Sequence, residues 1–227
     1  MYTIVDRRIP EPALKKLAKA GTPIPFFSED ITYPSISGHP DVFLCKTPKG
    51  LIAAPNTPAE VLHRLANLGI AITMGELYTG KVYPQSARYN AFVNTSFFIH
   101  NTRHSDPVLK QLCESLTSLH VKQAYTRCNL MEAGQLFITS DKGIEKVLTQ
   151  QKLDVFFIDP RDIILPGHNH GFFGGCTGIH DHTMYLIGSC NHFKQGNELK
   201  SKLTSRGIDL VELYDGPLWD GGSIICI

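Results

Sequence analysis

The chain ends on GGSIICI, from Gly221 to Ile227, and the stretch from Tyr2 to Phe27 at its beginning supplies the elements that this ending lacks. The apolar residues at the end predict one strand. The beginning predicts a strand, a helix begun at Pro10 and Pro12, and a second strand. Joined head to tail, the two segments make one strand–strand–helix–strand (ββαβ) unit. A unit divided in this way indicates a ring of repeats closed by its own termini, with one turn of each repeat near a common axis.

Further segments of the chain repeat the ββαβ pattern. The clearest starts at Asp41, where two short apolar strands meet at a glycine turn, and a helix follows with Thr57 as its expected N-cap and Pro58 at its first position. The five predicted units span residues 41–75, 88–125, 126–159, 171–213, and 220–227 together with 1–28.

These units recur at intervals of roughly 40 to 50 residues, as expected of a repeat protein. We therefore predict one α/β domain over residues 1–227. It is expected to be a five-bladed ββαβ propeller of pseudo-fivefold symmetry, closed by the N- and C-terminal segments. The alternative is a doubly wound sheet, but no glycine-rich phosphate turn follows the first strand.

The composition excludes several classes of protein. Hydrophobic residues make up 42% and charged residues 19% of the 227 residues, as in ordinary globular proteins. Lys and Arg number 22 against 21 for Asp and Glu, and a net charge of only +1 does not favour nucleic acid as a partner. No apolar run is long enough to span a bilayer. The six cysteines form no CxxC pair, and with no signal peptide this predicts reduced thiols and a cytoplasmic protein.

Two motifs sharpen the interpretation of the repeats. One is the ending from Trp219 to Ile227 (WDGGSIICI), and the other is HPDVFL from His39 to Leu44. With the five units, they resemble the pentein superfamily, the guanidine-modifying enzyme fold. Its members include deiminases, dimethylarginine hydrolases, amidinotransferases and a non-catalytic ribosome anti-association factor. The chain is similar to an uncharacterised or divergent amidinotransferase- or deiminase-like member.

The resemblance implies roles for three residues. The glycine-rich ending is similar to the strand that carries the family's nucleophilic cysteine, which assigns that role to Cys226. Asp41 corresponds to an aspartate that grips the substrate guanidinium, and His170, or alternatively His168, to the catalytic histidine. The chemistry requires these types, because a resonance-stabilised guanidinium carbon needs a thiolate nucleophile, carboxylates to hold it and an imidazole to move protons.

Other residues are expected to line the substrate pocket at the axis. These substrate-binding candidates are Asp220, His39, Asn94, Asn129, Cys128, Gly175, Cys176 and Trp219. Five histidines fall between His168 and His192, and imidazole is a zinc ligand. The turn that carries His180 and His182 is expected on the far side of its sheet, so no metal and no other cofactor is predicted.

Two functions remain open from the sequence. The first is a cysteine-dependent guanidine-modifying hydrolase or an amidinotransferase-like protein that acts on a small guanidino compound. The second is a non-catalytic pentein that binds a small molecule or a macromolecular partner at the axial pocket. The third unit reads Arg127-Cys128-Asn129 where the family's Glu-Gly-Gly signature would lie, and the fourth lacks a His-x-Asp, which favours the second function. Neither a nucleic-acid nor a membrane partner is expected.

Overall fold

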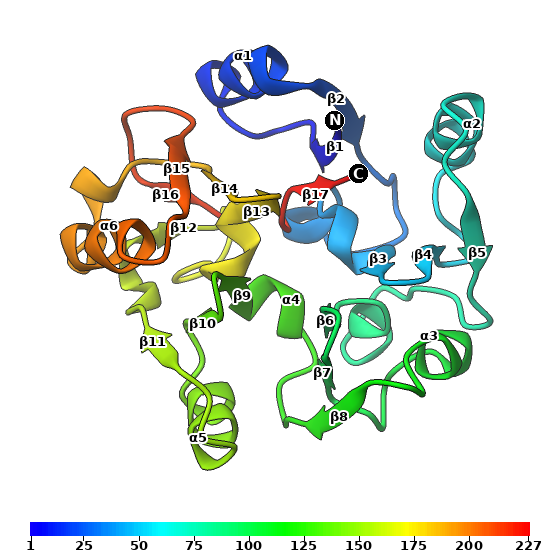
Figure 1. The fold of residues 1–227 in the computed structure, drawn as a ribbon. Coiled ribbons are helices and arrows are strands. Elements are labelled where there is room, and N and C mark those ends of the chain that lie inside the picture. The colour runs from blue at the N-terminus through cyan, green and yellow to red at the C-terminus, as the bar shows by residue number, and fades with distance from the viewer.

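Five small sheets surround a common centre in the computed structural model, which describes residues 1–227 (Figure 1). In each sheet the first two strands are antiparallel and the third is parallel to the second. The sheets are β17 (Ile225–Cys226), β1 (Tyr2–Asp6) and β2 (Thr22–Phe26); β3 (Leu44–Thr47), β4 (Gly50–Ala53) and β5 (Ile72–Met74); β6 (Phe92–Val93), β7 (Phe97–His100) and β8 (Thr117–His120); β9 (Leu130–Ala133), β10 (Leu136–Thr139) and β11 (Val155–Phe157); and β13 (Thr177–His180), β14 (Thr183–Leu186) and β15 (Asp209–Glu212). The α/β character and the ββαβ order that the sequence predicts are therefore present in the structure.

A helix joins the second and third strands of each sheet and lies at the periphery (Figure 1). These helices are α1 (Glu11–Ala20), α2 (Ala59–Asn67), α3 (Pro107–Leu112), α5 (Lys142–Gln150) and α6 (Gly196–Thr204). Their inner faces are apolar at helical spacing, as Val61 and Leu65 of α2 illustrate, and both side chains are buried. No helix is long and apolar enough to cross a membrane.

The start of α2 differs from the expected N-cap. The helix begins at Ala59 with Pro58 as its N-cap residue and without a side-chain cap. Thr57 instead donates its hydroxyl to the Ala54 carbonyl at 2.8 Å, so the prediction of Thr57 as the N-cap is wrong. A buried backbone carbonyl beside the hydroxyl competes with the helix amides for that hydrogen bond.

The two ends of the chain share one sheet. Tyr2 and Ile227 exchange backbone hydrogen bonds of 2.9 and 2.8 Å, and Thr3 pairs with Cys226 in the antiparallel register. The segment before β17 is bonded to the preceding sheet, because the Ser223 amide donates to the Gly175 carbonyl at 2.9 Å. The first and last segments of the chain therefore contribute strands to the same sheet.

The chain nearest the centre is not strand, as the sequence predicts, but turn. Asp41 lies in a 3₁₀ turn (η2, Pro40–Val42), Cys128 in the short helix α4 (Thr126–Asn129), and Gly175 in another 3₁₀ turn (η5, Gly174–Cys176). The first strands begin after these turns. Apolar patterning does not separate a buried turn from a buried strand, which explains the error. The turns bring side chains and backbone groups from every unit to the centre.

Four further 3₁₀ turns and one small sheet complete the structure. The turns are η1 (Pro34–Ile36), η3 (Gln85–Ala87) and η6 (Cys190–His192), with η4 (Pro160–Asp162) leading into β12 (Ile163–Ile164). Strand β12 pairs in parallel with β16 (Leu218–Trp219). The core consists of apolar clusters between each helix and its sheet, such as Leu17 of α1 against Val5 of β1.

Candidate functional site

A buried polar layer occupies the centre, built from the turns before the first strands. Asp41 Oδ2 accepts hydrogen bonds from the Cys128 thiol at 3.1 Å and from the Ser223 hydroxyl at 2.5 Å. The Asn90 side-chain amide donates to Cys128 Sγ at 3.2 Å. These four residues come from four different units and each is at most 2% exposed. Four of the five units therefore each deliver one polar side chain to a shared network.

Two glycines make this layer sterically feasible. A Cβ at Gly175 would lie 1.9 Å from Asp220 Oδ1, so only glycine allows that carboxylate to approach the turn. Gly222 has a positive φ of 64°, and a Cβ there would lie 2.2 Å from the Cβ of His39. Glycine at these two positions therefore lets Asp220 and His39 approach the backbone at the centre closely.

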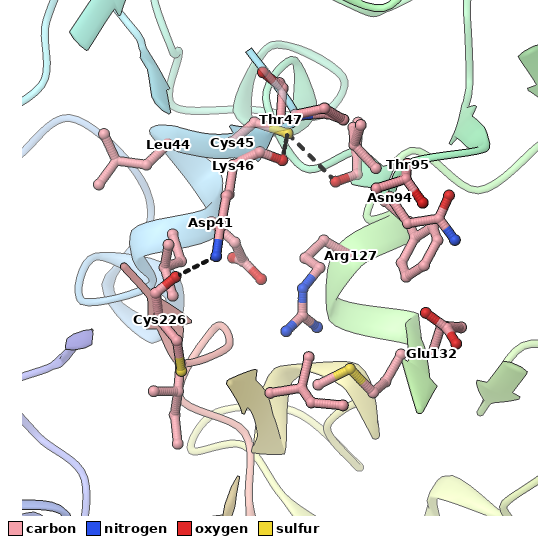
Figure 2. Close-up of a pocket in the computed structure, with 18 residues that line it drawn as sticks. Asp41, Leu44, Cys45, Lys46, Thr47, Asn94, Thr95, Arg127, Glu132 and Cys226 are labelled. Atoms are coloured by element: carbon pink, nitrogen blue, oxygen red, sulfur yellow. Dashed lines mark hydrogen bonds between the residues drawn. The ribbon is translucent and has the colours of Figure 1, made fainter. Parts of the chain in front are cut away.

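The first of two cavities beside this layer has a volume of about 260 Å³ and is shown in Figure 2. Its charged lining residues are Asp41, Lys46, Arg127 and Glu132, and no histidine lines it. The Arg127 guanidinium donates to the carbonyls of Gly174 at 2.9 Å and of Thr177 at 3.0 Å.

Cys226 borders this first cavity, but its thiol packs in an apolar cluster with Val5, Tyr185 and Ile187. Figure 2 shows its carbonyl oxygen turned towards Lys46, which donates to it at 2.8 Å, and its sulfur turned the other way. Burial raises the pKa of the Cys226 thiol to about 11, although the charges of Lys46 and Arg127 oppose the shift. The expected nucleophile is thus a protonated, apolar-packed thiol in this state.

The second cavity, of about 160 Å³, shares no lining residue with the first. It is lined by Tyr33, Ile36, His39, Tyr125, Cys128, Leu165, His168, His170, Phe172 and Asp220, with no lysine or arginine. The Nε2 of His39 lies 4.0 Å from Asp220 Oδ1, and neither ring nitrogen of His39 has a hydrogen-bond partner. A thiol, an imidazole and a carboxylate therefore border one small space.

The protonation states follow from burial. Burial, and then the Asp41 carboxylate, raise the pKa of Cys128 well above its ordinary value. Burial lowers the pKa of His39 and raises that of Asp220. Burial also raises the pKa of Asp41 to about 6, against the hydrogen bonds from Ser223 and Cys128. Both thiol and imidazole are therefore neutral at pH 7.

Three side chains at the centre could also hold a metal ion. The ligand atoms of His39, Asp41 and Cys128 all lie within 4.8 Å of one another, and Asp41 Oδ1 makes no hydrogen bond. A neutral imidazole, a carboxylate and a thiolate are all ligands of Zn²⁺. None of these three belongs to the histidine-rich segment from His168 to His192.

The residues that the sequence singles out are divided between the two cavities. Asp41, Asn94 and Cys226 line the first, while His39, Cys128, His170 and Asp220 line the second, together with His168. The predicted nucleophile Cys226 and the predicted acid–base His170 therefore border different spaces. His170 Nδ1 is 2.9 Å from the Gly171 carbonyl, and His168 Nε2 is 2.8 Å from the Ser35 hydroxyl.

The remaining candidates line neither cavity. Asn129 donates to the Tyr125 carbonyl at 2.9 Å, and the Cys176 thiol donates to the Phe172 carbonyl at 3.4 Å. Gly175 leaves room for the Asp220 carboxylate, because it has no Cβ, and Trp219 lies in β16.

Sequence reasoning missed Lys46 and Arg127 in the first cavity and Tyr33 and Tyr125 in the second. Arg127 carried a signal, since it precedes Cys128 at the start of the third unit. The two tyrosines belong to connecting segments, where no periodic pattern marks a site. Their hydroxyls are 3.1 Å apart.

Comparison with known proteins supports the fold. Residues 4–225 match the model of a family described as "Family of unknown function (DUF6873)". Among solved structures, the chain is similar to a cysteine-to-serine mutant of DDAH from Pseudomonas aeruginosa complexed with citrulline. The TM-score is 0.56 at 9% sequence identity, over 93% of this chain and 91% of that chain. At this identity the likeness shows the fold alone, which is of the pentein type. No curated protein matches the chain.

Proposed function

The chain belongs to the family of unknown function DUF6873, and we propose that it uses a cysteine to modify a small guanidino compound in its second cavity. The observation that carries the proposal is the meeting of Cys128, His39 and Asp220 around one space that has no lysine or arginine. The pentein-type fold, shared with DDAH, is consistent with guanidine chemistry.

The lining of this cavity suits a small planar cation. Asp220 supplies a buried carboxylate, already positioned by hydrogen bonds from the amides of Phe172 and Gly222 at 2.9 and 3.0 Å. The aromatic residues Tyr33 and Phe172 also line the cavity, and aromatic rings attract delocalised cations. A guanidinium group can donate to the carboxylate and stack on these rings at once.

The bound cation would also activate the thiol. Its positive charge beside Cys128 favours the thiolate, and His39 would accept the thiol proton. The sulfur would then form a bond to the guanidinium carbon, and one C–N bond would break as His39 returns the proton to the leaving amine. Water would next attack the thiouronium carbon, releasing a ureido product and the free thiol.

This scheme assigns the nucleophile to Cys128 and keeps Cys226 as the competing candidate from the sequence. The test is turnover of methylguanidine, guanidinoacetate and arginine, followed by released ammonia or amine, in wild type and in the matched variants Cys128→Ser and Cys226→Ser. We expect Cys128→Ser to lose turnover by roughly 100-fold or more and Cys226→Ser to retain it. The reverse pattern would make Cys226 the nucleophile.

Two further readouts separate this mechanism from its alternatives. Intact-mass measurement of trapped enzyme should detect the covalent adduct on Cys128. Treatment with EDTA should leave turnover unchanged, whereas a loss that Zn²⁺ restores would favour metal-assisted hydrolysis at His39, Asp41 and Cys128.

A specific observation favours a non-catalytic alternative. The Cys128 thiol donates to the Asp41 carboxylate, and a neighbouring carboxylate opposes thiolate formation. If guanidino compounds bind by calorimetry and Asp220→Asn abolishes the binding, but no product and no adduct appear, the protein is a binder of this ligand class.

We also propose that the five sheets form a single closed propeller. Support comes from the pairing of β1 with β17 and from the Asp41 amide, which donates to the Gly222 carbonyl at 3.4 Å across the neighbouring units. The split unit would then seal the ring around both cavities.

A further inference from the structure

The first cavity is lined by two positively charged side chains that form no salt bridge, Lys46 and Arg127. Arg127 is half-buried, where an unpaired cation is costly because its charge is partly desolvated, whereas Lys46 is exposed. The two side chains come from different units, β3 and α4, and project towards the same space (Figure 2).

Neutral groups hold these cations in place. Arg127 donates to the backbone carbonyls of Gly174 and Thr177, and Lys46 donates to the carbonyl of Cys226. These bonds fix where the charges lie without cancelling them. Such fixed donors resemble an anion site organised in advance of its ligand.

The acidic residues of the lining compensate only in part. Asp41 Oδ2 is occupied by the Cys128 thiol and the Ser223 hydroxyl, and burial raises the pKa of Asp41 to about 6. One oxygen of Glu132 accepts the Gln135 amide at 2.6 Å. The remaining wall is largely apolar, with Leu44, Phe92, Met131, Ile179 and Ile224 among its residues.

We propose that this cavity binds a small organic carboxylate, with its charged end between Arg127 and Lys46 and its hydrocarbon body against the apolar wall. The volume of about 260 Å³ accommodates a compact molecule of this kind. This ligand class is opposite in charge to the guanidino compound proposed for the second cavity. The site is therefore separate and does not depend on thiol chemistry.

The test is isothermal titration calorimetry of the full chain with butyrate, butylamine and inorganic phosphate as probes. We expect saturable binding of butyrate that weakens with salt, and no binding of butylamine. Saturable binding of butylamine, or of phosphate without butyrate, would overturn the proposal, and so would the absence of butyrate binding to folded protein.

Variants locate the site. Lys46→Met removes an exposed side chain and should weaken butyrate binding by roughly tenfold or more. The matched control Lys49→Met, from the same hairpin but outside the cavity, should bind as wild type. Equal affinity in Lys46→Met and Lys49→Met would refute the assignment. Arg127→Met is less decisive because Arg127 also ties two units together, so Lys46 carries the test.

One more variant separates this proposal from the proposed function. Cys128→Ser should lose turnover of guanidino compounds but keep butyrate affinity, since Cys128 lines only the second cavity. Loss of turnover together with retained butyrate binding supports two sites. Loss of butyrate binding in folded Cys128→Ser would contradict their separation.

Discussion

Asp41 is the residue at which the two cavities meet. It lines the first, while its Oδ2 accepts a hydrogen bond from Cys128, which lines the second. The sequence singles out Asp41 as a guanidinium clamp through the HPDVFL motif. In the structure its most direct partners are the thiol of Cys128 and the hydroxyl of Ser223, so it organises the central layer.

At the same scale, His100 gives a prediction about pH. Its Nε2 donates to the Ala124 carbonyl at 2.7 Å, its Nδ1 lies 2.6 Å from the Ser105 hydroxyl, and burial lowers its pKa to about 4. An unfolded histidine has a pKa of about 6.5. The His100 imidazole therefore binds a proton more tightly in the unfolded chain than in the folded one. The free energy of unfolding should fall as the pH drops from about 6.5 to 4, by about 3 kcal/mol once the pH is below both pKa values.

Urea unfolding at pH 7.5 and 4.5 checks this expectation. His100→Gln should lose most of this pH dependence, whereas the control His63→Gln, at an exposed position, should keep that of wild type. A His100→Gln protein whose stability falls with pH as steeply as that of wild type would show that other groups dominate.

At the scale of elements, the repeated helices and strands follow from local pattern, whereas the turns before the first strands follow from crowding. Gly222 and Gly69 allow the effect of local conformation to be separated from that of crowding. Both have a positive φ, of 64° and 71°, but their surroundings differ. A Cβ at Gly69 meets nothing within 4 Å, but at Gly222 it would collide with His39.

Gly69→Ala should therefore cost only the backbone strain of a left-handed residue, about 1 to 2 kcal/mol. Gly222→Ala should cost clearly more in the free energy of unfolding, because His39 and its turn must also move. Urea denaturation of both variants measures the difference. If the two substitutions destabilise the protein equally, the contact between Gly222 and His39 does not limit the side chain at position 222.

At the scale of the whole molecule, the pairing of the two termini places residues from both ends of the chain beside the first cavity. Removing Ile225 to Ile227 deletes β17, two buried side chains and the carbonyl that holds Lys46. We expect the truncated protein to lose several kcal/mol of stability, or to lose cooperative unfolding altogether.

A circular permutant supplies the control. Joining Ile227 to Met1 through a short Gly/Ser linker and opening the chain between the exposed residues Lys81 and Val82 keeps every pairing of the terminal sheet. This permutant should unfold cooperatively with a stability near that of wild type. A folded truncation, or an unfolded permutant, would contradict the role assigned to the terminal strands.

The sequence by itself determined the repeating ββαβ order and the union of the two ends, because apolar periodicity, proline and glycine act locally. It also marked Asp41, Cys128, His39 and Asp220 as polar residues near the starts of units. Only the tertiary structure decided how these residues are grouped. Cys226 and His170 border different cavities, while Cys128 lies with His39 and Asp220. That grouping depends on how each turn orients its side chain and on contacts across units, and neither is encoded in the spacing of residues along one strand.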